Sequence, residues 1–354
     1  VTATLFSANT TDYAQGRGGA IAVSQHSDLS IDNCLFEYNQ AQDGGAVRIE
    51  TDSRSIVRDC IFLGNYASDK NFGSGAAIDS GSSDLLVGAS SFIGNLADRE
   101  GGAIHLLGGE CSIEDSTFVD NSAVLGGAIS SIANLSVRNC EFASNSAVEL
   151  GGAIHSIGVI TFYASTFHGN QALEWGGAAN CGNTAKFIEC SFSDNSAMTG
   201  GAISTYSGID GDIINCRYYH NYATCDGGAI FIDHSDDFRI TNSLCIENYA
   251  DRNGGAMNVN GGVTIANCTI YDNSALDNGG GIHALHFESQ SWNNILWSNV
   301  DANGRGESSQ IYFMQTSILP SVYYSCVQGW TGKLGGTGST GSDPLLVIVQ
   351  GDDG

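Results

Sequence analysis

Four charged or ionisable side chains could form a catalytic surface. Arg48, Asp79 and His105 occupy the same position in three successive units of a sequence repeat, and His155 occupies it two units later. A carboxylate or an imidazole can act as a general base, and a guanidinium can neutralise an acidic sugar beside it, as cleavage of an acidic polysaccharide requires. The alternative is a solvent-facing position that collects polar residues by chance, so catalysis at these four residues is a hypothesis.

Carboxylates gather in the turns before a recurring Gly-Gly pair. Glu149 and Glu174 lie in successive turns, and Trp175 follows Glu174. The same turns in other units hold further acidic residues, namely Asp43, Asp69, Asp98 with Glu100, Asp226, Asp251 and Asp277. Stacked carboxylates repel each other and a divalent cation relieves the repulsion, so Ca²⁺ is a candidate ligand of Glu149 and Glu174. The calcium repeat Gly-Gly-x-Gly-x-Asp is absent, and the alternative is a solvated acidic edge that favours solubility.

Aromatic residues offer candidate binding positions. Tyr222 and Tyr249 share one position in adjacent units, and Trp175 lies beside the acidic turn. Tyrosine and tryptophan suit contact with a glycan or a protein, because each combines an apolar ring with a polar group. Ordinary packing at a corner of the fold is the alternative explanation for all three.

A repeat of about 26 residues sets the position of all these residues. Its first motif, Phe-x-x-Asn, degrades at the aromatic position but keeps its asparagine at Asn9, Asn39, Asn65, Asn95, Asn121, Asn145, Asn170, Asn195, Asn221, Asn248, Asn273 and Asn299. Isoleucine, valine, phenylalanine, threonine and serine between Gly-rich turns favour strands, and propeller blades need about 40 residues or more. The repeat therefore predicts an all-β fold, a single-stranded right-handed parallel β-helix of about twelve coils with three short strands per coil.

Equivalent positions of successive units support this fold, because they stack about 4.8 Å apart in a parallel β-helix. The position after Gly-Gly-Ala is apolar, from Ile21 and Val47 onward, and is predicted to be interior. The next position, which holds Arg48 and Asp79, is mainly polar and is predicted to face outward. An interior aromatic stack is predicted at Phe118, Phe142, Phe167 and Phe192, and a small interior column at Cys34, Cys60, Ser90, Ser116, Cys140, Ser165, Cys190, Cys216, Ser243 and Cys268.

Two corner positions have conformational explanations. The asparagine is expected to tolerate the left-handed or turn conformation of a tight corner and to bond the next asparagine in a ladder. The Gly-Gly pair is expected where positive φ or a close backbone approach excludes a Cβ. The alanine after the Gly-Gly pair lies two positions before the polar column, so its side chain is expected on the same side of the strand as that column.

Recurrent Gly-Gly-Ala-Ile/Leu/Val and Phe-x-x-Asn resemble the chlamydial polymorphic membrane protein repeat, and the resemblance extends over residues 6 to about 299. It implies a secreted right-handed β-helix of the kind that forms the passenger of surface adhesins. The sequence departs from the motif at Ser74-Gly75-Ala76-Ala77, where the Gly-Gly pair is expected to be offset by an insertion. No autotransporter barrel is visible.

Composition limits the partners. Asp and Glu outnumber Lys and Arg 38 to 13, which gives a net charge of −25 and makes nucleic acid and anionic polysaccharide unlikely partners. No apolar run reaches the length of a membrane helix, and no signal peptide is visible. The 11 cysteines lack zinc spacing and are expected to be mostly buried free thiols.

Two domains are predicted, a repeat domain at 1–300 and irregular closing coils with a cap at 301–354. The favoured function is a non-catalytic extracellular or cell-surface scaffold, adhesin-like, that binds a surface glycan or a protein. One alternative is a polysaccharide lyase or glycoside hydrolase. Another is a filament subunit that self-associates along the solenoid axis. No cofactor other than Ca²⁺ is expected.

Overall fold

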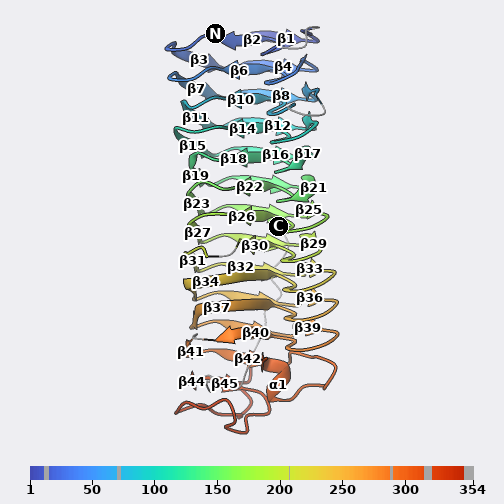
Figure 1. Cartoon of the computed structure of the whole chain (residues 1–354), viewed down its shortest axis with the longest axis vertical. Helices are drawn as coiled ribbons and strands as arrows, with labels where there is room; N and C mark the ends of the chain where they lie inside the picture. The colour runs from blue at the N-terminus through green and yellow to red at the C-terminus, as the bar shows by residue number, and fades with distance from the viewer. Residues whose placement is uncertain (12–15, 70–72, 207, 288–289, 315–320, 347–354) are drawn as a thin grey trace.

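A computed structural model describes residues 1–11, 16–69, 73–206, 208–287, 290–314 and 321–346. The chain winds as a parallel β-helix, and Figure 1 shows its coils stacked along the long axis from the blue N-terminal end to the red C-terminal end. Each strand pairs in parallel with its equivalent one coil away, as Phe92 pairs with both Phe62 and Phe118. The all-β fold predicted from the repeat is confirmed.

Three parallel sheets form the faces of the helix. The described residues place 13 strands in the sheet that carries the aromatic stack. They are β1 (Leu5–Ser7), β4 (Leu35–Glu37), β8 (Ile61–Leu63), β12 (Ser91–Ile93), β16 (Thr117–Val119), β20 (Glu141–Ala143), β24 (Thr166–His168), β28 (Ser191–Ser193), β32 (Arg217–Tyr219), β35 (Leu244–Ile246), β38 (Thr269–Tyr271), β42 (Ile295–Trp297) and β45 (Cys326–Val327). The sheet after the asparagine corner is made of β5 (Gln40–Ala41), β9 (Tyr66–Ala67), β13 (Leu96–Ala97), β17 (Ser122–Leu125), β21 (Ser146–Leu150), β25 (Gln171–Ala172), β29 (Ser196–Ala197), β33 (Tyr222–Ala223), β36 (Tyr249–Ala250) and β39 (Ser274–Ala275).

The third sheet is the largest and contains two strand columns. The column after Gly-Gly-Ala comprises β2 (Ile21–Val23), β6 (Val47–Ile49), β10 (Ile78–Ser80), β14 (Ile104–Leu106), β18 (Ile129–Ser131), β22 (Ile154–Ser156), β26 (Ala179–Cys181), β30 (Ile203–Thr205), β40 (Ile282–Phe287) and β43 (Ile311–Phe313). The following column comprises β3 (Leu29–Asp32), β7 (Arg54–Arg58), β11 (Asp84–Gly88), β15 (Glu110–Glu114), β19 (Asn134–Arg138), β23 (Ile160–Tyr163), β27 (Ala185–Ile188), β31 (Gly211–Ile214), β41 (Gln290–Trp292) and β44 (Ser321–Tyr323). The two columns merge in the long strands β34 (Ile230–Thr241) and β37 (Met257–Ala266).

The interior columns are filled as the sequence predicts. Phe118 lies 4.7 Å from Phe92 and 4.8 Å from Phe142 between ring centroids, with the planes within 7° of parallel. The stack continues through Phe167 and Phe192 at the same spacing, and all of these rings are fully buried. The stack runs from Phe6 to Tyr218 and buries a large apolar area in each of these coils, which stabilises the solenoid.

The asparagines form a buried ladder, but they do not supply the left-handed corner. Asn145 Nδ2 donates to Asn170 Oδ1 at 3.0 Å and to the Phe118 carbonyl at 2.9 Å. The same contacts repeat along the ladder, at Asn39, Asn65, Asn95, Asn121, Asn170, Asn195, Asn221, Asn248 and Asn273. The positive φ belongs to the preceding residue, such as Ser144 at 54°. The predicted ladder is confirmed, and the left-handed conformation predicted for the asparagine itself is wrong.

The Gly-Gly pair has two different constraints. Gly151 adopts φ of 64°, whereas a Cβ on Gly152 would lie 2.0 Å from the Gly177 carbonyl oxygen of the next coil. The alanines that follow, such as Ala103, are fully buried in the core, so their expected parity with the polar column is wrong. The expected offset in the Ala76 unit is also wrong, because Gly75 takes the first glycine position and Ala76 replaces the second.

The small interior column is a second hydrogen-bond ladder. Its hydroxyl groups accept backbone N–H groups from the coil before, as Ser90 Oγ accepts from Cys60 N at 3.1 Å and Ser165 Oγ accepts from Cys140 N at 3.2 Å. All 11 cysteines are free thiols, and only Cys225 and Cys326 are not buried. Small side chains that can accept a hydrogen bond suit this column, which explains its mixture of cysteine and serine.

The C-terminal coils close the ladder in an irregular way. A single helical turn, α1 (Glu307–Gln310), precedes β43, and β43, β44 and β45 still pair with the coil before them. Residues near Thr337 and Thr340 cover the last coil through backbone bonds to Tyr324 and Val327. The predicted cap extends beyond this part, since 315–320 and 347–354 lie outside the described residues.

Candidate functional site

The candidate catalytic residues lie side by side on successive strands. Arg48 of β6 pairs with Asp79 of β10, which pairs with His105 of β14. The prediction that this column is exposed is wrong, because Arg48, Asp79 and His105 are 7%, 1% and 7% exposed, and His155 is 7% exposed. The parity of the strand directs these side chains away from the core, but neighbouring columns cover them.

A chain of basic and acidic side chains links the first three candidates. Arg48 Nη1 donates to Asp79 Oδ2, and His105 Nδ1 lies 2.9 Å from Asp79 Oδ1. His105 Nε2 faces Glu100 Oε2 at 3.4 Å. Both ring nitrogens of His105 therefore face carboxylates. Buried charges of this kind require partners on every side.

Groups at both edges of the column complete this network. The hydrogen bond from His105 lowers the pKa of Glu100, which also accepts from Ser130 Oγ at 3.2 Å. On the opposite edge Glu50 Oε1 lies 3.8 Å from Arg48 Nε and 3.0 Å from Arg17 Nη1. Burial raises the pKa of Asp43, against the opposing effect of Arg48. Arg48, Asp79, His105, Glu100 and Glu50 each face a basic or acidic side chain of the fold, so the members of this network are directed at one another.

This arrangement limits what the trio can do chemically. Asp79 has both oxygens engaged and is almost fully buried, so a substrate cannot reach it without breaking an ion pair. Arg48 Nε has no hydrogen-bond partner among the described residues, and its guanidinium is directed to Asp79. The geometry fits an internal ion-pair network that holds three coils in register.

His155 belongs to a separate cluster. Ser130 lies between it and His105 in the column. Its Nδ1 is 3.0 Å from Asn180 Oδ1, and Asn180 Nδ2 donates to Ser204 Oγ at 2.7 Å. The amide is thereby oriented with its oxygen toward the imidazole, so Nδ1 donates and Nε2 is left as an acceptor. Burial lowers the pKa of His155, with Asn180 opposing the shift.

An aromatic pair covers this second cluster. The Tyr206 ring lies 5.6 Å from the Trp175 ring and 6.3 Å from the His155 ring, edge-on to the imidazole. A Cβ on Gly182 would lie 2.9 Å from both Tyr206 Cδ2 and Ile157 Cγ2, so the missing side chain makes room for the tyrosine. Tyr206 is not among the residues predicted from the sequence, because the only signal for its position is the absence of a side chain at Gly182 in the adjacent unit.

The acidic turns do not form one continuous stripe. The column directly before Gly-Gly carries Asp43, Glu100 and Asp226, but its other described positions are not acidic, namely Arg17, Ser74, Leu125, Leu150, Trp175, Thr199, Asn253 and Asn278. Glu149 and Glu174 are exposed one residue earlier, beside Leu150 and Trp175. No group of three or more His, Cys, Asp or Glu side chains in the described residues is arranged to hold a metal ion. Calcium binding at Glu149 and Glu174 stays a prediction.

The tyrosine pair predicted to share a column is present. Tyr222 and Tyr249 stack with centroids 5.6 Å apart, and Tyr222 Oη donates to Asp251 Oδ2 at 2.6 Å. That hydrogen bond raises the pKa of Tyr222 to about 12. Both rings are half-buried, so corner packing accounts for much of their contact area.

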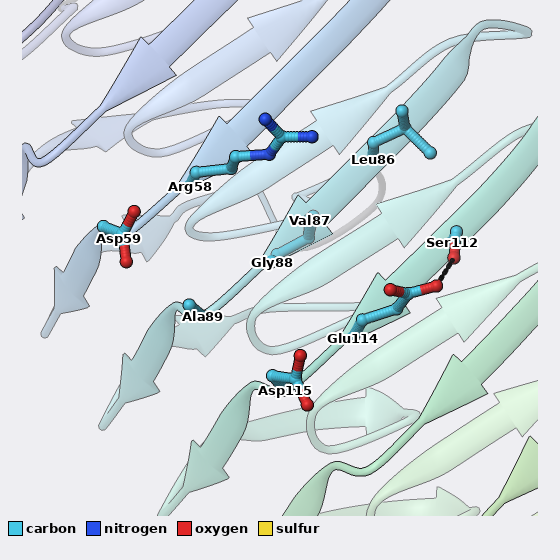
Figure 2. A pocket seen from close by; sticks show the side chains of 9 residues that line it. All are labelled: Arg58, Asp59, Leu86, Val87, Gly88, Ala89, Ser112, Glu114 and Asp115. Carbon is cyan, nitrogen blue, oxygen red and sulfur yellow. Dashed lines mark hydrogen bonds between the residues drawn. The ribbon is translucent and has the colours of Figure 1, made fainter.

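A shallow pocket lies on another face, at the ends of β7, β11 and β15 (Figure 2). Gly88 stands between Arg58 and Glu114 in register, and its missing side chain leaves a notch between the two charged groups. Asp59 and Asp115 lie at the rim, and Ser112 Oγ donates to Glu114 at 3.3 Å. The charged side chains of the pocket are all exposed.

Comparisons with known proteins agree with this fold. The protein family described as the right-handed β-helix region matches residues 2–172. The family described as the Chlamydia polymorphic membrane protein repeat matches residues 189–206 and 267–285. Metabotropic glutamate receptor-like protein R of Dictyostelium discoideum is 36% identical over 124 residues, which is 34% of this chain and 8% of that protein. No solved structure gives a significant match.

No helix in the described residues is long and apolar enough to cross a membrane. Both sequence matches fall on the repeats whose asparagine ladder and Gly-Gly corners the structure displays. The chain is therefore a right-handed parallel β-helix protein with repeats of the Chlamydia polymorphic membrane protein type.

Proposed function

We propose that the protein is a non-catalytic extracellular or cell-surface β-helix, an adhesin-like scaffold that presents its lateral faces to a ligand. The observation that carries this proposal is the closed ion-pair network of the candidate catalytic column. Asp79 is 1% exposed and contacts both Arg48 and His105. A general base has to reach the proton that it removes, and this carboxylate is held away from solvent.

The repeat supports the proposed location. Chlamydia polymorphic membrane protein repeats are matched at 189–206 and 267–285, and their name places that family at a membrane. A net charge of −25 favours solubility and discourages non-specific binding to anionic surfaces. A stack of about 4.8 Å per coil also presents an extended face, which suits binding more than enclosure of a substrate.

A combined glycan-array and depolymerisation screen on one purified sample, with and without Ca²⁺, tests the proposal. Binding without release of reducing or unsaturated sugar ends is the expected outcome. Turnover of a glycan that is lost in His105→Ala, while the circular dichroism spectrum is unchanged, would overturn the proposal and support the enzyme alternative. Sedimentation at high protein concentration tests the filament alternative in the same sample.

A further inference from the structure

The surface around Trp175 differs from the rest of the polar column. On the coils from β18 to β30, apolar side chains border the column on both edges. Ile132 and Ile157 are 47% and 49% exposed on one edge, and Leu173 is 61% exposed beyond the other. Isolated exposed apolar residues are common, but several on adjacent coils indicate a contact surface.

Hydrogen-bond acceptors and negative charge surround this apolar surface. Glu149 and Glu174 are exposed beside Trp175. Tyr206 reaches across the column toward both carboxylates. Burial raises the pKa of its hydroxyl, and the two carboxylates raise it further. Below the Tyr206 ring, His155 is only 7% exposed. Its Nδ1 contacts Asn180, and its Nε2 has no hydrogen-bond partner in the described part of the chain.

We propose that the Trp175–Tyr206 pair, with Glu149 and Glu174 beside it, is the docking site for a lysine or arginine side chain of a partner protein segment. The inference rests on the proposed function, because it names the partner of that scaffold. A cation placed over an aromatic face is attracted by the ring quadrupole, and two carboxylates strengthen the attraction in this strongly acidic chain. The unpaired His155 Nε2 is an acceptor for an N–H donor, which a basic side chain supplies.

The apolar borders explain why the partner is a protein segment and not a free amine. Ile157 and Tyr206 approach the same point above Gly182, so an apolar neighbour of the bound cation finds a continuous surface there. Leu173 offers a second contact beside the acidic pair. A neutral glycan would use the rings but would leave the two formal charges of Glu149 and Glu174 without a partner.

Fluorescence titration with two peptides tests the proposal. Acetyl-Ser-Leu-Lys-Leu-Ser-amide is expected to bind about fivefold to tenfold more tightly than the matched peptide with glutamine in place of lysine. The fluorescence change should vanish in Trp175→Phe. Glu149→Gln with Glu174→Gln should weaken binding of the lysine peptide by about tenfold, whereas Glu114→Gln with Glu141→Gln, an equal charge change at exposed positions elsewhere, should change it less than about twofold.

Three outcomes would overturn the docking site. They are equal affinity for both peptides, equal loss in the two double variants, and binding of cellopentaose at Trp175 in place of the lysine peptide. The third outcome would leave the scaffold function intact, because a ligand would still bind without turnover. Glycan depolymerisation that depends on His105 would instead contradict the proposed function, whatever the peptides do.

Discussion

The last asparagine of the ladder, Asn299, donates its Nδ2–H to Oε1 of Gln310 over 2.7 Å. A glutamine eleven residues away thereby takes the place that the next asparagine would occupy. Gln310 Nε2 donates in return to the Asn299 carbonyl at 3.0 Å, and both side chains are fully buried. The helical turn α1 ends at Gln310 and places its side chain beside Asn299. The ladder therefore ends on an asparagine whose side chain is hydrogen-bonded.

Replacing Gln310 with alanine should therefore destabilise the C-terminal coils. The change removes Gln310 Oε1, the acceptor for one Asn299 Nδ2–H and for the Asn299 backbone N–H, while the bond from Nδ2 to the Ile270 carbonyl remains. Leaving these buried donors unpaired costs about 2 kcal/mol or more in the free energy of unfolding. Urea denaturation followed by circular dichroism measures the loss. Gln171→Ala is the control, since that glutamine is exposed, and it should shift stability by less than about 0.5 kcal/mol. Equal effects of the two changes would contradict the capping role.

Alanine substitutions at two glycines distinguish the cost of a steric clash from the cost of a strained backbone. A Cβ on Gly152 meets a carbonyl oxygen at 2.0 Å, whereas a Cβ on Gly94 meets nothing within 4 Å although its φ is 60°. Gly94→Ala should cost only the left-handed strain, about 1 to 2 kcal/mol. Gly152→Ala should cost more than about 3 kcal/mol, because the coils have to separate. Thermal unfolding of both variants ranks the two effects, and the reverse ranking would refute this account of the Gly-Gly corner.

The fold was predictable because stacking gives every copy of a position one environment. The Phe118 column, the Asn145 column and the first glycine of each pair all lie where the repeat places them. A repeated residue type shows a shared requirement, and twelve copies average out the drift at single units. The left-handed residue before the asparagine was not visible, because residues as different as Tyr38 and Glu247 adopt that conformation.

The candidate site was less predictable. Strand parity correctly places Ile78 in the hydrophobic core and leaves Asp79 out of it, and register correctly brings Asp79 beside Arg48 and His105. Parity does not reveal which side chains from other columns cover an outward position. Tyr206 covers His155 only because Gly182 leaves space and the turn directs the ring backward. Such contacts depend on corner geometry, which the repeat pattern does not encode.

Thiol reactivity tests the burial of the cysteine columns. Burial raises the pKa of Cys111 to about 11 and of Cys181 to about 12, so these thiols resist deprotonation as well as access. In the folded protein a thiol-specific disulfide reagent should modify only Cys225 and Cys326, which are partly exposed. After unfolding it should modify all 11. A total of nine in the unfolded state would reveal a disulfide and contradict the free thiols.

The stability of the aromatic-covered cluster should depend on pH through His155. Burial lowers its pKa, so the unfolded chain binds a proton at this histidine at a higher pH than the folded chain does. Stability is therefore lost as the pH falls below about 6.5, the ordinary pKa of histidine, toward the lower folded value. His155→Gln removes this dependence, and its urea midpoint should fall less between about pH 7.5 and pH 5.5 than that of the unmodified protein. His26→Gln, at an exposed position, should follow the unmodified profile, and parallel profiles for all three proteins would show that His155 is protonated equally in the folded and unfolded states.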